Sequence, residues 1–300
     1  MKHEYVNLNN VQTHLITWDE PANCKGKDVI ICITGNPGIP DFYIDFGAQL
    51  HRNMRLPVCI IGQAGHEEVF DKKSNILEGQ EHLFNLKGQL KHKIELITNY
   101  IDKDSRLHLV GHSIGAWLIL ELVNDERISN RQICSVNLLF PTLQRMADTM
   151  NGKFLNSVIR NAHVIFMFLF HLAFILPDFA QNCLIKTYLK MSSLPPHYCN
   201  SIKEFVKPTV GEKVLFLAYN EMDTVKELNE DAIDKIKNIT NVIYSSHDNW
   251  TPLNYIEDLK KFEPEITLQN VKCDHAFVLK SSIDVAEMVA NFISAKNLDL

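Results

Sequence analysis

A serine at position 113 stands in a pattern that could carry nucleophilic chemistry. Residues 107–116, LHLVGHSIGA, form an apolar run that stops at a serine with glycine two residues before and two residues after it. Where a strand turns sharply into a helix, such glycines leave room for the close approach of the two elements, and the apex side chain is lifted clear of the sheet. The flanks LHLV and AWLILELVN read as strand and helix. The pattern therefore predicts that Ser113 is a nucleophile for acyl transfer.

A serine hydroxyl needs a histidine that takes its proton and a further group that orients this histidine. On a sheet of this kind the expected chain order is serine, acid, histidine. His275, in CDHAFVLKS, follows the last strand candidate and precedes the last helical pattern, so it is the predicted base. His247, beside an aspartate at the end of NVIYSSHD, is the competing candidate.

The predicted acid is Asp248, which ends a strand candidate ahead of His275. Asp223, within LAYNEMDTVKEL, is the alternative acid, although this stretch also reads as a helix. Asp274 cannot easily orient the ring of its own neighbour and is expected to be a solvated loop residue. Both Asp248 and Asp223 stay open as candidates at this point.

Acyl transfer also develops an oxyanion, which needs backbone N–H donors aimed at it. One predicted donor is Ile114, directly after the nucleophile. The second should come from the loop TGNPGIPDFY after the strand candidate at 29–33. Pro37 has no N–H, which leaves Asn36 or Gly38, and we favour Asn36.

Short apolar runs alternate with helical patterns along most of the chain. Strand candidates are the two β segments of EYVNLNNVQTHLITWD and residues 29–33, 57–61, 107–110, 135–140, 241–244 and 266–271. Helical patterns cover 42–53, 76–101, 116–124, 251–261 and 281–295. Continuous apolar strands with intervening helices predict a mostly parallel sheet that is covered by helices on both faces. We expect one α/β domain over 1–300, with a helical lid or cap insertion at 141–237, where the strand rhythm disappears.

The insertion contains a strongly apolar segment at 164–176, VIFMFLFHLAFIL. As a helix it would be about 20 Å long, short of the roughly 30 Å of a bilayer core, so it should not span a membrane. Residues 153–213 carry seven Lys or Arg against three acids, a net +4, in a chain of net charge -6. We favour shallow insertion into an anionic lipid surface, with a buried lid helix as the alternative. The predicted lipid-facing residues are Phe166, Phe168, Phe170 and Phe174.

Composition narrows the possible partners and compartment. The net charge of -6 and the absence of a long basic run argue against a nucleic-acid partner. The amino terminus, MKHEYVNLNN, lacks the apolar segment of a secretory signal, so we expect the cytosolic side of the membrane. Seven cysteines without C-x-x-C spacing are expected to be reduced core residues, and the predicted chemistry needs no metal or cofactor.

Several of these motifs together resemble the lipid droplet-associated hydrolase family, which are serine hydrolases of the α/β-hydrolase superfamily. The resemblance rests on ITGNPGIPDFY, GQAGHE, LKHKIELI, LVGHSIGAW, LFPT, SSHDNWTP and DHAFV and extends from about residue 29 to about residue 290. It implies an α/β-hydrolase fold and a triad of Ser113, Asp248 and His275. It also implies lipid esters, sterol esters among them, as substrates, and residence on lipid droplets and the endoplasmic reticulum membrane.

Two other functions use the same residues or the same fold. A non-catalytic lipid-surface protein could have kept a hydrolase fold, because fold alone does not determine function. An acyltransferase or thioesterase could pass the acyl group from the same serine to another acceptor or take it from a thioester. An intact set of serine, histidine, acid and oxyanion loop favours catalysis, and hydrolysis of lipid esters is the predicted activity.

Overall fold

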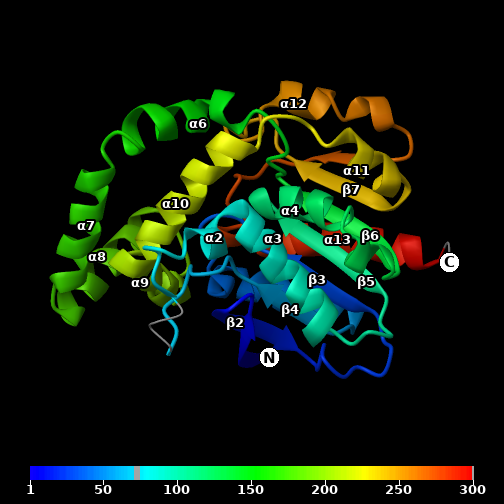
Figure 1. The fold of residues 1–300 in the computed structure, drawn as a ribbon, viewed down its shortest axis with the longest axis horizontal. Helices are drawn as coiled ribbons and strands as arrows, with labels where there is room; N and C mark the ends of the chain where they lie inside the picture. The colour runs from blue at the N-terminus through cyan, green and yellow to red at the C-terminus, as the bar shows by residue number, and fades with distance from the viewer. Residues whose placement is uncertain (71–74, 299–300) are drawn as a thin grey trace.

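The computed structural model describes residues 1–70 and 75–298 and centres on one eight-stranded sheet (Figure 1). The strand order is β1-β2-β4-β3-β5-β6-β7-β8, in which the strands from β4 to β8 run parallel and β1 and β2 form an antiparallel hairpin at one edge. The strands are β1 Lys2–Leu8, β2 Val11–Trp18, β3 Val29–Ile33, β4 Val58–Ile61, β5 Leu107–His112, β6 Ile133–Leu139, β7 Thr240–Tyr244 and β8 Thr267–Asn270.

Local sequence explains the character of these strands. The central strand β3, VIICI, is buried along its whole length, as a strand covered on both faces requires. The hairpin turns at Asn9 and Asn10, which have φ of 49° and 62°, the left-handed pair that tight hairpins favour. The edge strand β8, TLQN, is polar and largely exposed. The predicted α/β fold with a mostly parallel sheet is confirmed.

Helices cover both faces of the sheet. One face is packed by α1 (Ile44–Met54) and α13 (Ser282–Leu298), whose apolar residues join those of β3 and β4 in one core cluster. The other face is packed by α3 (Leu86–Glu95), α4 (Ile114–Leu122) and α11 (Glu230–Ile236) around a larger cluster. The sheet thus lies between two apolar layers, one on each face.

The helix predicted at 76–101 is wrong as a single element. The structure has a short α2 (Glu81–Phe84), then α3, and then a π-helical turn (Leu96–Tyr100). Asn85 breaks the run because its backbone is extended and its side-chain oxygen accepts a hydrogen bond from the N–H of Gly88, 2.8 Å away, which caps α3. The helical pattern at 251–261 is likewise shorter, with α12 at Leu253–Glu257 and a 3-10 turn at Lys260–Phe262.

Between β6 and β7 the fully described chain contains helices and no strand. Its α-helices are α6 Met150–Phe154, α7 His163–Ile175, α8 Asp178–Met191, α9 Cys199–Phe205, α10 Pro208–Thr224 and α11. Figure 1 shows α7, α8 and α9 standing out from the sheet, while α10 runs back towards it. The helical segment between β6 and β7 therefore has one side against the edge of the sheet and one side that points away from it.

Candidate active site

Ser113 lies at the sharp turn between β5 and α4. Its φ of 54° and ψ of -121° are strained for a residue with a side chain, and it is 8 % exposed. The flanking glycines are required by contact distances. A Cβ on Gly111 would lie 2.6 Å from the carbonyl oxygen of Gly115, and a Cβ on Gly115 would lie 2.4 Å from that of Ile33. The sequence thus folds into the turn that the glycine spacing predicts.

The structure brings Ser113, His275 and Asp248 together in one hydrogen-bonded row. The Nε2 atom of His275 is 2.9 Å from the Oγ atom of Ser113, and its Nδ1 atom is 2.6 Å from the Oδ2 atom of Asp248. These distances suit proton transfer from the serine to the ring and orientation of the ring by the carboxylate. All three residues lie just beyond the carboxyl ends of β5, β7 and β8.

The Asp248 carboxylate is held on both oxygens. Its side chain is 1 % exposed, and its second oxygen, Oδ1, accepts hydrogen bonds from the N–H groups of Trp250 (2.8 Å) and Thr251 (3.2 Å). Backbone donors stabilise the charged form of a buried carboxylate and fix its rotation. Asp248 is therefore built to present Oδ2 to His275.

The alternative candidates lie elsewhere. Asp223 forms a two-point ion pair with Arg160, with oxygen to nitrogen distances of 2.8 and 2.6 Å. His247 is exposed, and its ring nitrogen lies 3.3 Å from the hydroxyl of Ser246. Asp274 is exposed beside His275, as a loop residue would be. In the described structure, none of these three side chains forms a hydrogen bond with Ser113, His275 or Asp248.

The loop after β3 runs directly against the serine. A Cβ on Gly35 would lie 3.1 Å from the Cβ of Ser113, so only glycine fits there without displacement. The N–H of Gly35 donates to the hydroxyl of Tyr43 (2.8 Å), and the N–H of Gly38 donates to Nδ1 of His66 (2.9 Å). The N–H of Asn36 has no acceptor among the described residues.

These contacts distinguish Asn36 from Gly38, the two residues that the sequence offers as the second oxyanion donor. The Gly38 N–H is already used, whereas the Asn36 N–H is available beside Ser113. Ile114 is the first residue of α4, where backbone N–H groups have no partner within the helix. The N–H groups of Asn36 and Ile114, from different elements, are therefore the two candidate donors for an oxyanion at Ser113.

A buried relay below the serine was not predicted from the sequence. The hydroxyl of Tyr43 lies 2.6 Å from Nδ1 of His112, and Nε2 of His112 lies 2.9 Å from the backbone carbonyl of His275. Burial holds the pKa of His112 well below its usual range, so its ring is neutral and donates through Nε2. The relay ties the Gly35 loop to the backbone of the predicted base. His112 directly precedes Ser113, which was the available sequence signal.

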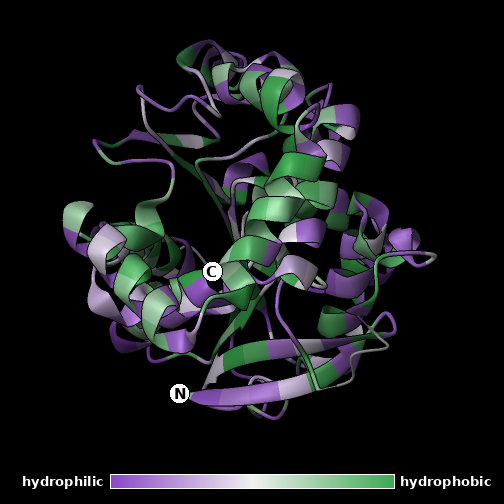
Figure 2. Cartoon of the chain, turned by 90° about the vertical axis from the view of Figure 1, so that its left-hand side faces the viewer, coloured by the Kyte–Doolittle hydropathy of each residue, from purple (hydrophilic) through white to green (hydrophobic). Residues whose placement is uncertain are grey.

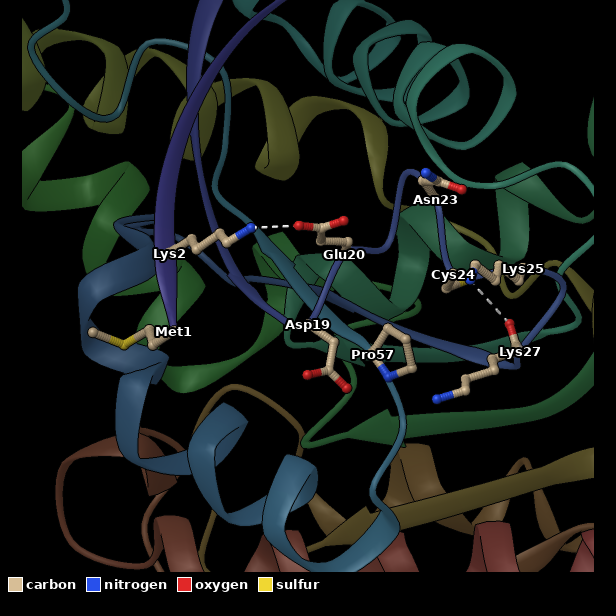
Figure 3. Close-up of a pocket in the computed structure, with 9 residues that line it drawn as sticks. All are labelled: Met1, Lys2, Asp19, Glu20, Asn23, Cys24, Lys25, Lys27 and Pro57. Carbon is tan, nitrogen blue, oxygen red and sulfur yellow. Dashed lines mark hydrogen bonds and ion pairs between the residues drawn. The ribbon is translucent and has the colours of Figure 1, made fainter.

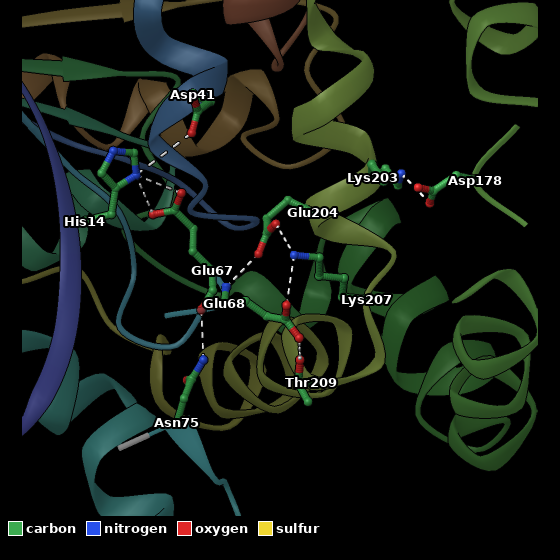
Figure 4. A network of polar contacts seen from close by, with 10 residues as sticks. All are labelled: His14, Asp41, Glu67, Glu68, Asn75, Asp178, Lys203, Glu204, Lys207 and Thr209. Atoms are coloured by element: carbon green, nitrogen blue, oxygen red, sulfur yellow. Dashed lines mark hydrogen bonds and ion pairs between the residues drawn. The ribbon is translucent and has the colours of Figure 1, made fainter. Parts of the chain in front are cut away.

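One group of side chains could hold a cation by distance. A ring nitrogen of His14 and carboxylate oxygens of Asp41 and Glu67 lie within 4.8 Å of one another. Nδ1 of His14 is 2.9 Å from Glu67, so the pair already forms a hydrogen bond (Figure 4). Burial raises the pKa of the Glu67 carboxyl to about 7. The contact between His14 and Glu67 accounts for this arrangement without an ion.

Figure 4 also shows the contacts between the loop after β4 and the region of α9 and α10. The Nζ atom of Lys207 lies 2.9 Å from Glu68 and 2.6 Å from Glu204. The N–H of Glu68 also donates to Glu204 at 2.6 Å. The loop after β4 is thereby attached to α9 and to the start of α10.

A separate surface pocket of about 580 Å³ lies near the amino terminus, around Lys2 and Glu20 (Figure 3). Pro57, which lines it, comes just before β4, whereas Ser113 comes just after the parallel strand β5. The pocket is therefore at the opposite edge of the sheet from the serine. Five of its nine lining residues are charged, and none of the nine is Ser113, His275 or Asp248.

The outward side of α7 and α8 is an apolar surface. No residue of α7 is buried, although eleven of its thirteen residues, all but His163 and His171, are apolar. The exposed members of this apolar surface are Val164, Ile165, Phe168, Leu169, Leu172, Phe174 and Ile175 of α7, and Phe179, Leu184, Tyr188 and Met191 of α8. Figure 2 views the molecule from this side and shows hydrophobic ribbon in the helices there. Contiguous exposed apolar area of this kind marks a binding surface.

The four phenylalanines predicted to face lipid do not share one environment. Phe168 and Phe174 are exposed by 64 % and 49 %. Phe166 is half-buried, and Phe170 turns inward, where its ring packs against Phe205 at 5.7 Å between centroids. Because α7 is apolar around its whole circumference, periodicity in the sequence could not tell these directions apart.

The positive charge predicted for 153–213 is also reduced by pairing. Lys213 is buried. Three further cations form ion pairs: Arg160 with Asp223, Lys203 with Asp178, and Lys207 with Glu68 and Glu204. Lys153, Lys186 and Lys190 are exposed and have no ion pair among the described residues. The apolar surface therefore has a small basic rim in place of a broad cationic patch.

The length of these helices bears on how they could meet a lipid. No single helix in the described ranges is long and apolar enough to cross a bilayer. The segments Met150–Ile159 and His163–Ile175 pass that test only as a pair, by length and composition, and they are bent by 84° at the break between them.

Comparison with known proteins identifies the family. The sequence model of the family described as lipid-droplet associated hydrolase matches residues 26–278. A Drosophila melanogaster protein named lipid droplet-associated hydrolase is 38 % identical, with 98 % of each chain covered. The Homo sapiens protein of that name is 29 % identical, with 89 % of this chain and 85 % of that protein covered.

Solved structures that resemble this chain show the fold. The thioesterase domain from the curacin biosynthetic pathway has a TM-score of 0.65 and 13 % identity, with 96 % of this chain and 99 % of that chain covered. A putative lipase from Acinetobacter baumannii has a TM-score of 0.66 and 13 % identity, with 100 % and 93 % covered. The chain has the α/β-hydrolase fold, is a hydrolase, and belongs to the lipid droplet-associated hydrolase family.

Proposed function

We propose that this hydrolase is a serine esterase that cleaves lipid esters through an acyl-enzyme on Ser113. The observation that carries the proposal is the unbroken hydrogen-bonded row from Ser113 through His275 to Asp248, at a strained turn between a buried strand and a helix. A merely structural serine would not require that strain, which costs on the order of 1–3 kcal/mol.

In the first half of the reaction, the Oγ atom of Ser113 attacks the ester carbonyl carbon while its proton passes to Nε2 of His275. Asp248 stabilises the resulting imidazolium through the bond to Nδ1. The tetrahedral oxyanion accepts hydrogen bonds from the N–H groups of Ile114 and Asn36. The C–O bond to the alcohol then breaks, and His275 returns the proton to the leaving oxygen.

In the second half, water attacks the acyl carbon and gives its proton to His275. The bond between the acyl carbon and the Oγ atom of Ser113 breaks, and His275 protonates the serine as the carboxylic acid leaves. The net change is ester plus water to alcohol plus acid. An alcohol in place of water would give transfer of the acyl group, so the acceptor decides between esterase and acyltransferase.

The first experiment labels purified protein with a fluorophosphonate probe and compares it with Ser113→Ala. We expect labelling of the wild type and none of the variant, since the probe forms a bond to an activated serine. Ser246→Ala, beside His247, is the matched control and should label normally. An unlabelled wild type, or a labelled Ser113→Ala, would reject the assignment.

Substrate class is tested separately with a panel of esters, including sterol esters, triacylglycerols and acyl thioesters. The proposal expects hydrolysis of lipid esters in excess of thioesters, and products analysed with added alcohol should be mainly the free acid. Exclusive thioester cleavage would favour a thioesterase. Exclusive transfer to alcohol would favour an acyltransferase.

The second part of the proposal concerns location. Residues 141–237 form a cap whose apolar surface on α7 and α8 lies in the surface of lipid droplets and of the endoplasmic reticulum membrane. The support is the exposed apolar area of these helices, with Lys186 and Lys190 at its rim, and the droplet association in the names of the relatives. Each apolar side chain moved from water into lipid contributes on the order of 1–2 kcal/mol.

Flotation with artificial droplets and with liposomes tests this location. Changing Ile165, Phe168, Leu172 and Ile175 to Ser removes four outward side chains and should release the protein from the lipid fraction. The matched control changes Ile76, Leu253 and Ile283 to Ser. These residues are also exposed and apolar but lie outside α7 and α8, so this variant should still float.

Salt provides the second measurement in this assay. Lys186→Gln with Lys190→Gln should weaken binding to anionic liposomes modestly and make it less sensitive to salt, because only two unpaired cations are removed. A wild type that does not float, or a quadruple Ser variant that does, would show that α7 is not the contact with lipid.

A further inference from the structure

The side chain of Asn36 is bound by the cap, not by the sheet. Its Nδ2 group donates to the backbone carbonyl of Val214 at 3.2 Å and to the Oε1 atom of Glu221 at 2.9 Å. Val214 and Glu221 are seven residues apart in α10, and therefore lie on the same face of the helix. A single amide group thus joins the loop after β3 to two turns of α10.

Glu221 is an unusual residue for this place. It is 4 % exposed, and Asn36 is the only hydrogen-bond partner of its carboxyl group among the described residues. Burial raises the pKa of its carboxyl to about 8, with the Asn36 hydrogen bond opposing the rise. At neutral pH the group is therefore a neutral acid, which accepts the Asn36 hydrogen bond through its carbonyl oxygen.

No cation forms an ion pair with Glu221 among the described residues. Of the charged and titratable side chains that contact α10 or belong to it, Arg160 pairs with Asp223, His163 lies 3.2 Å from the hydroxyl of Tyr219, and Lys213 donates to backbone carbonyls. On α3, which packs against α10, Lys93 donates to Gly62, Gln63 and Gln89. These partners leave Glu221 with Asn36 alone in the described structure.

We propose that Glu221 is a positioning residue that holds Asn36 so that its backbone N–H points at the oxyanion. This role rests on the proposed esterase function. Asn36 lies in a loop without regular secondary structure, between Gly35, held by Tyr43, and Gly38, held by His66. Between these two glycines, Asn36 is attached through its side chain. If Nδ2 loses the Glu221 oxygen, only the longer bond to the Val214 carbonyl remains, and the N–H is free to leave the direction that the oxyanion requires.

This attachment also makes the oxyanion loop depend on the cap. The helix α10 carries Gly211, where a Cβ would lie 2.7 Å from the ring of Phe170 in α7. A chain of contacts therefore leads from the apolar surface through α7 and α10 to Asn36. The geometry of the loop is set by a helix that belongs to the lipid-facing segment.

The test compares Glu221→Ala and Glu221→Gln with wild type in steady-state hydrolysis of a short soluble ester. Loss of the anchor in Glu221→Ala should lower kcat by about 10- to 100-fold with KM little changed, because the N–H acts mainly in the transition state. Glu221→Gln keeps a neutral carbonyl acceptor and should retain kcat within about twofold at neutral pH. Glu212→Ala, on the same helix, is the matched control and should behave as wild type.

A double-mutant comparison distinguishes positioning from general stabilisation. Asn36→Ala should lower kcat, and adding Glu221→Ala to it should lower kcat little further, since Asn36→Ala already removes the contact with Glu221.

The outcomes separate this proposal from the one on which it rests. A wild type that neither hydrolyses esters nor labels with fluorophosphonate would reject the esterase function itself. An active wild type with an equally active Glu221→Ala would reject only the role of Glu221. If Glu221→Ala does not fold, Glu221→Met, which fills the site without a hydrogen-bond acceptor of comparable strength, decides, and wild-type kcat in that variant would overturn the role.

Discussion

Replacing Asp248 by Asn should disable the enzyme by reversing the proton pattern of His275. In the structure one carboxylate oxygen faces Nδ1 of His275 at 2.6 Å, and the other accepts the N–H groups of Trp250 and Thr251. Asparagine has only one oxygen. It must face either the two backbone donors or the ring, and its NH2 group takes the other position.

The magnitude follows from these two choices. Turning the NH2 towards Trp250 and Thr251 would leave two buried donors unpaired, at about 1–3 kcal/mol each, or about 2–6 kcal/mol together. The preferred state instead points the NH2 at Nδ1 of His275, which must then lose its proton. The remaining ring proton sits on Nε2 and faces Ser113, so the ring cannot accept the serine proton. At about 1.4 kcal/mol per factor of ten, kcat/KM should fall between about 30-fold and about 10⁴-fold.

The assay is hydrolysis of a soluble ester by purified Asp248→Asn, with thermal unfolding to show that the variant is folded. Asp223→Asn and Asp274→Asn serve as controls, because Asp223 pairs with Arg160 and Asp274 is exposed. Both should keep kcat/KM within about twofold. The reasoning would be refuted by a folded Asp248→Asn with near wild-type activity, and reassignment to Asp223 would follow if Asp223→Asn alone were inactive.

Three further predictions concern stability. Ser113→Gly should be inactive yet unfold at a higher temperature than Ser113→Ala, because glycine relieves the strain at a φ of 54°; a lower temperature would contradict this. Asn85→Ala removes the cap of α3 and should lower the free energy of unfolding in urea by about 1 kcal/mol, while Asn53→Ala, on an exposed helix end, should change it little. The folded protein keeps a proton on Glu221 up to about pH 8, whereas the unfolded chain loses it near 4.5, so the stability of wild type should fall relative to Glu221→Gln as pH rises between these values and then level off; parallel urea curves across that range would oppose it.

Much of the candidate site could be predicted because its signals are local. The nucleophile turn is one contiguous stretch in which strand, glycines, Ser113 and helix follow one another. Parallel strands bring their carboxyl ends to one edge, so residues that end β7 and β8 could be expected near Ser113 from chain order alone. The apolar helix α7 also followed from composition, since residues 164–176 form one apolar run.

Other features depended on contacts between distant segments. The break at Asn85 was missed because a capping hydrogen bond overrides an otherwise helical pattern. The sequence also did not show that the N–H of Gly38 donates to His66, which is the contact that favours Asn36 as the proposed second oxyanion donor. The inward turn of Phe170 and the pairing of Lys203 and Lys207 required the packing of α7, α9 and α10.

The sequence by itself determined the α/β class, the family and the identity of the candidate nucleophile, because periodicity, glycine spacing and chain order act over short stretches. The tertiary structure alone decided which groups support that nucleophile. Asn36 and Glu221 are separated by 185 residues, and Tyr43 and His112 by 69. No local pattern encodes such pairs, because a buried hydrogen bond depends on where two separately formed elements are brought by the packing of the core.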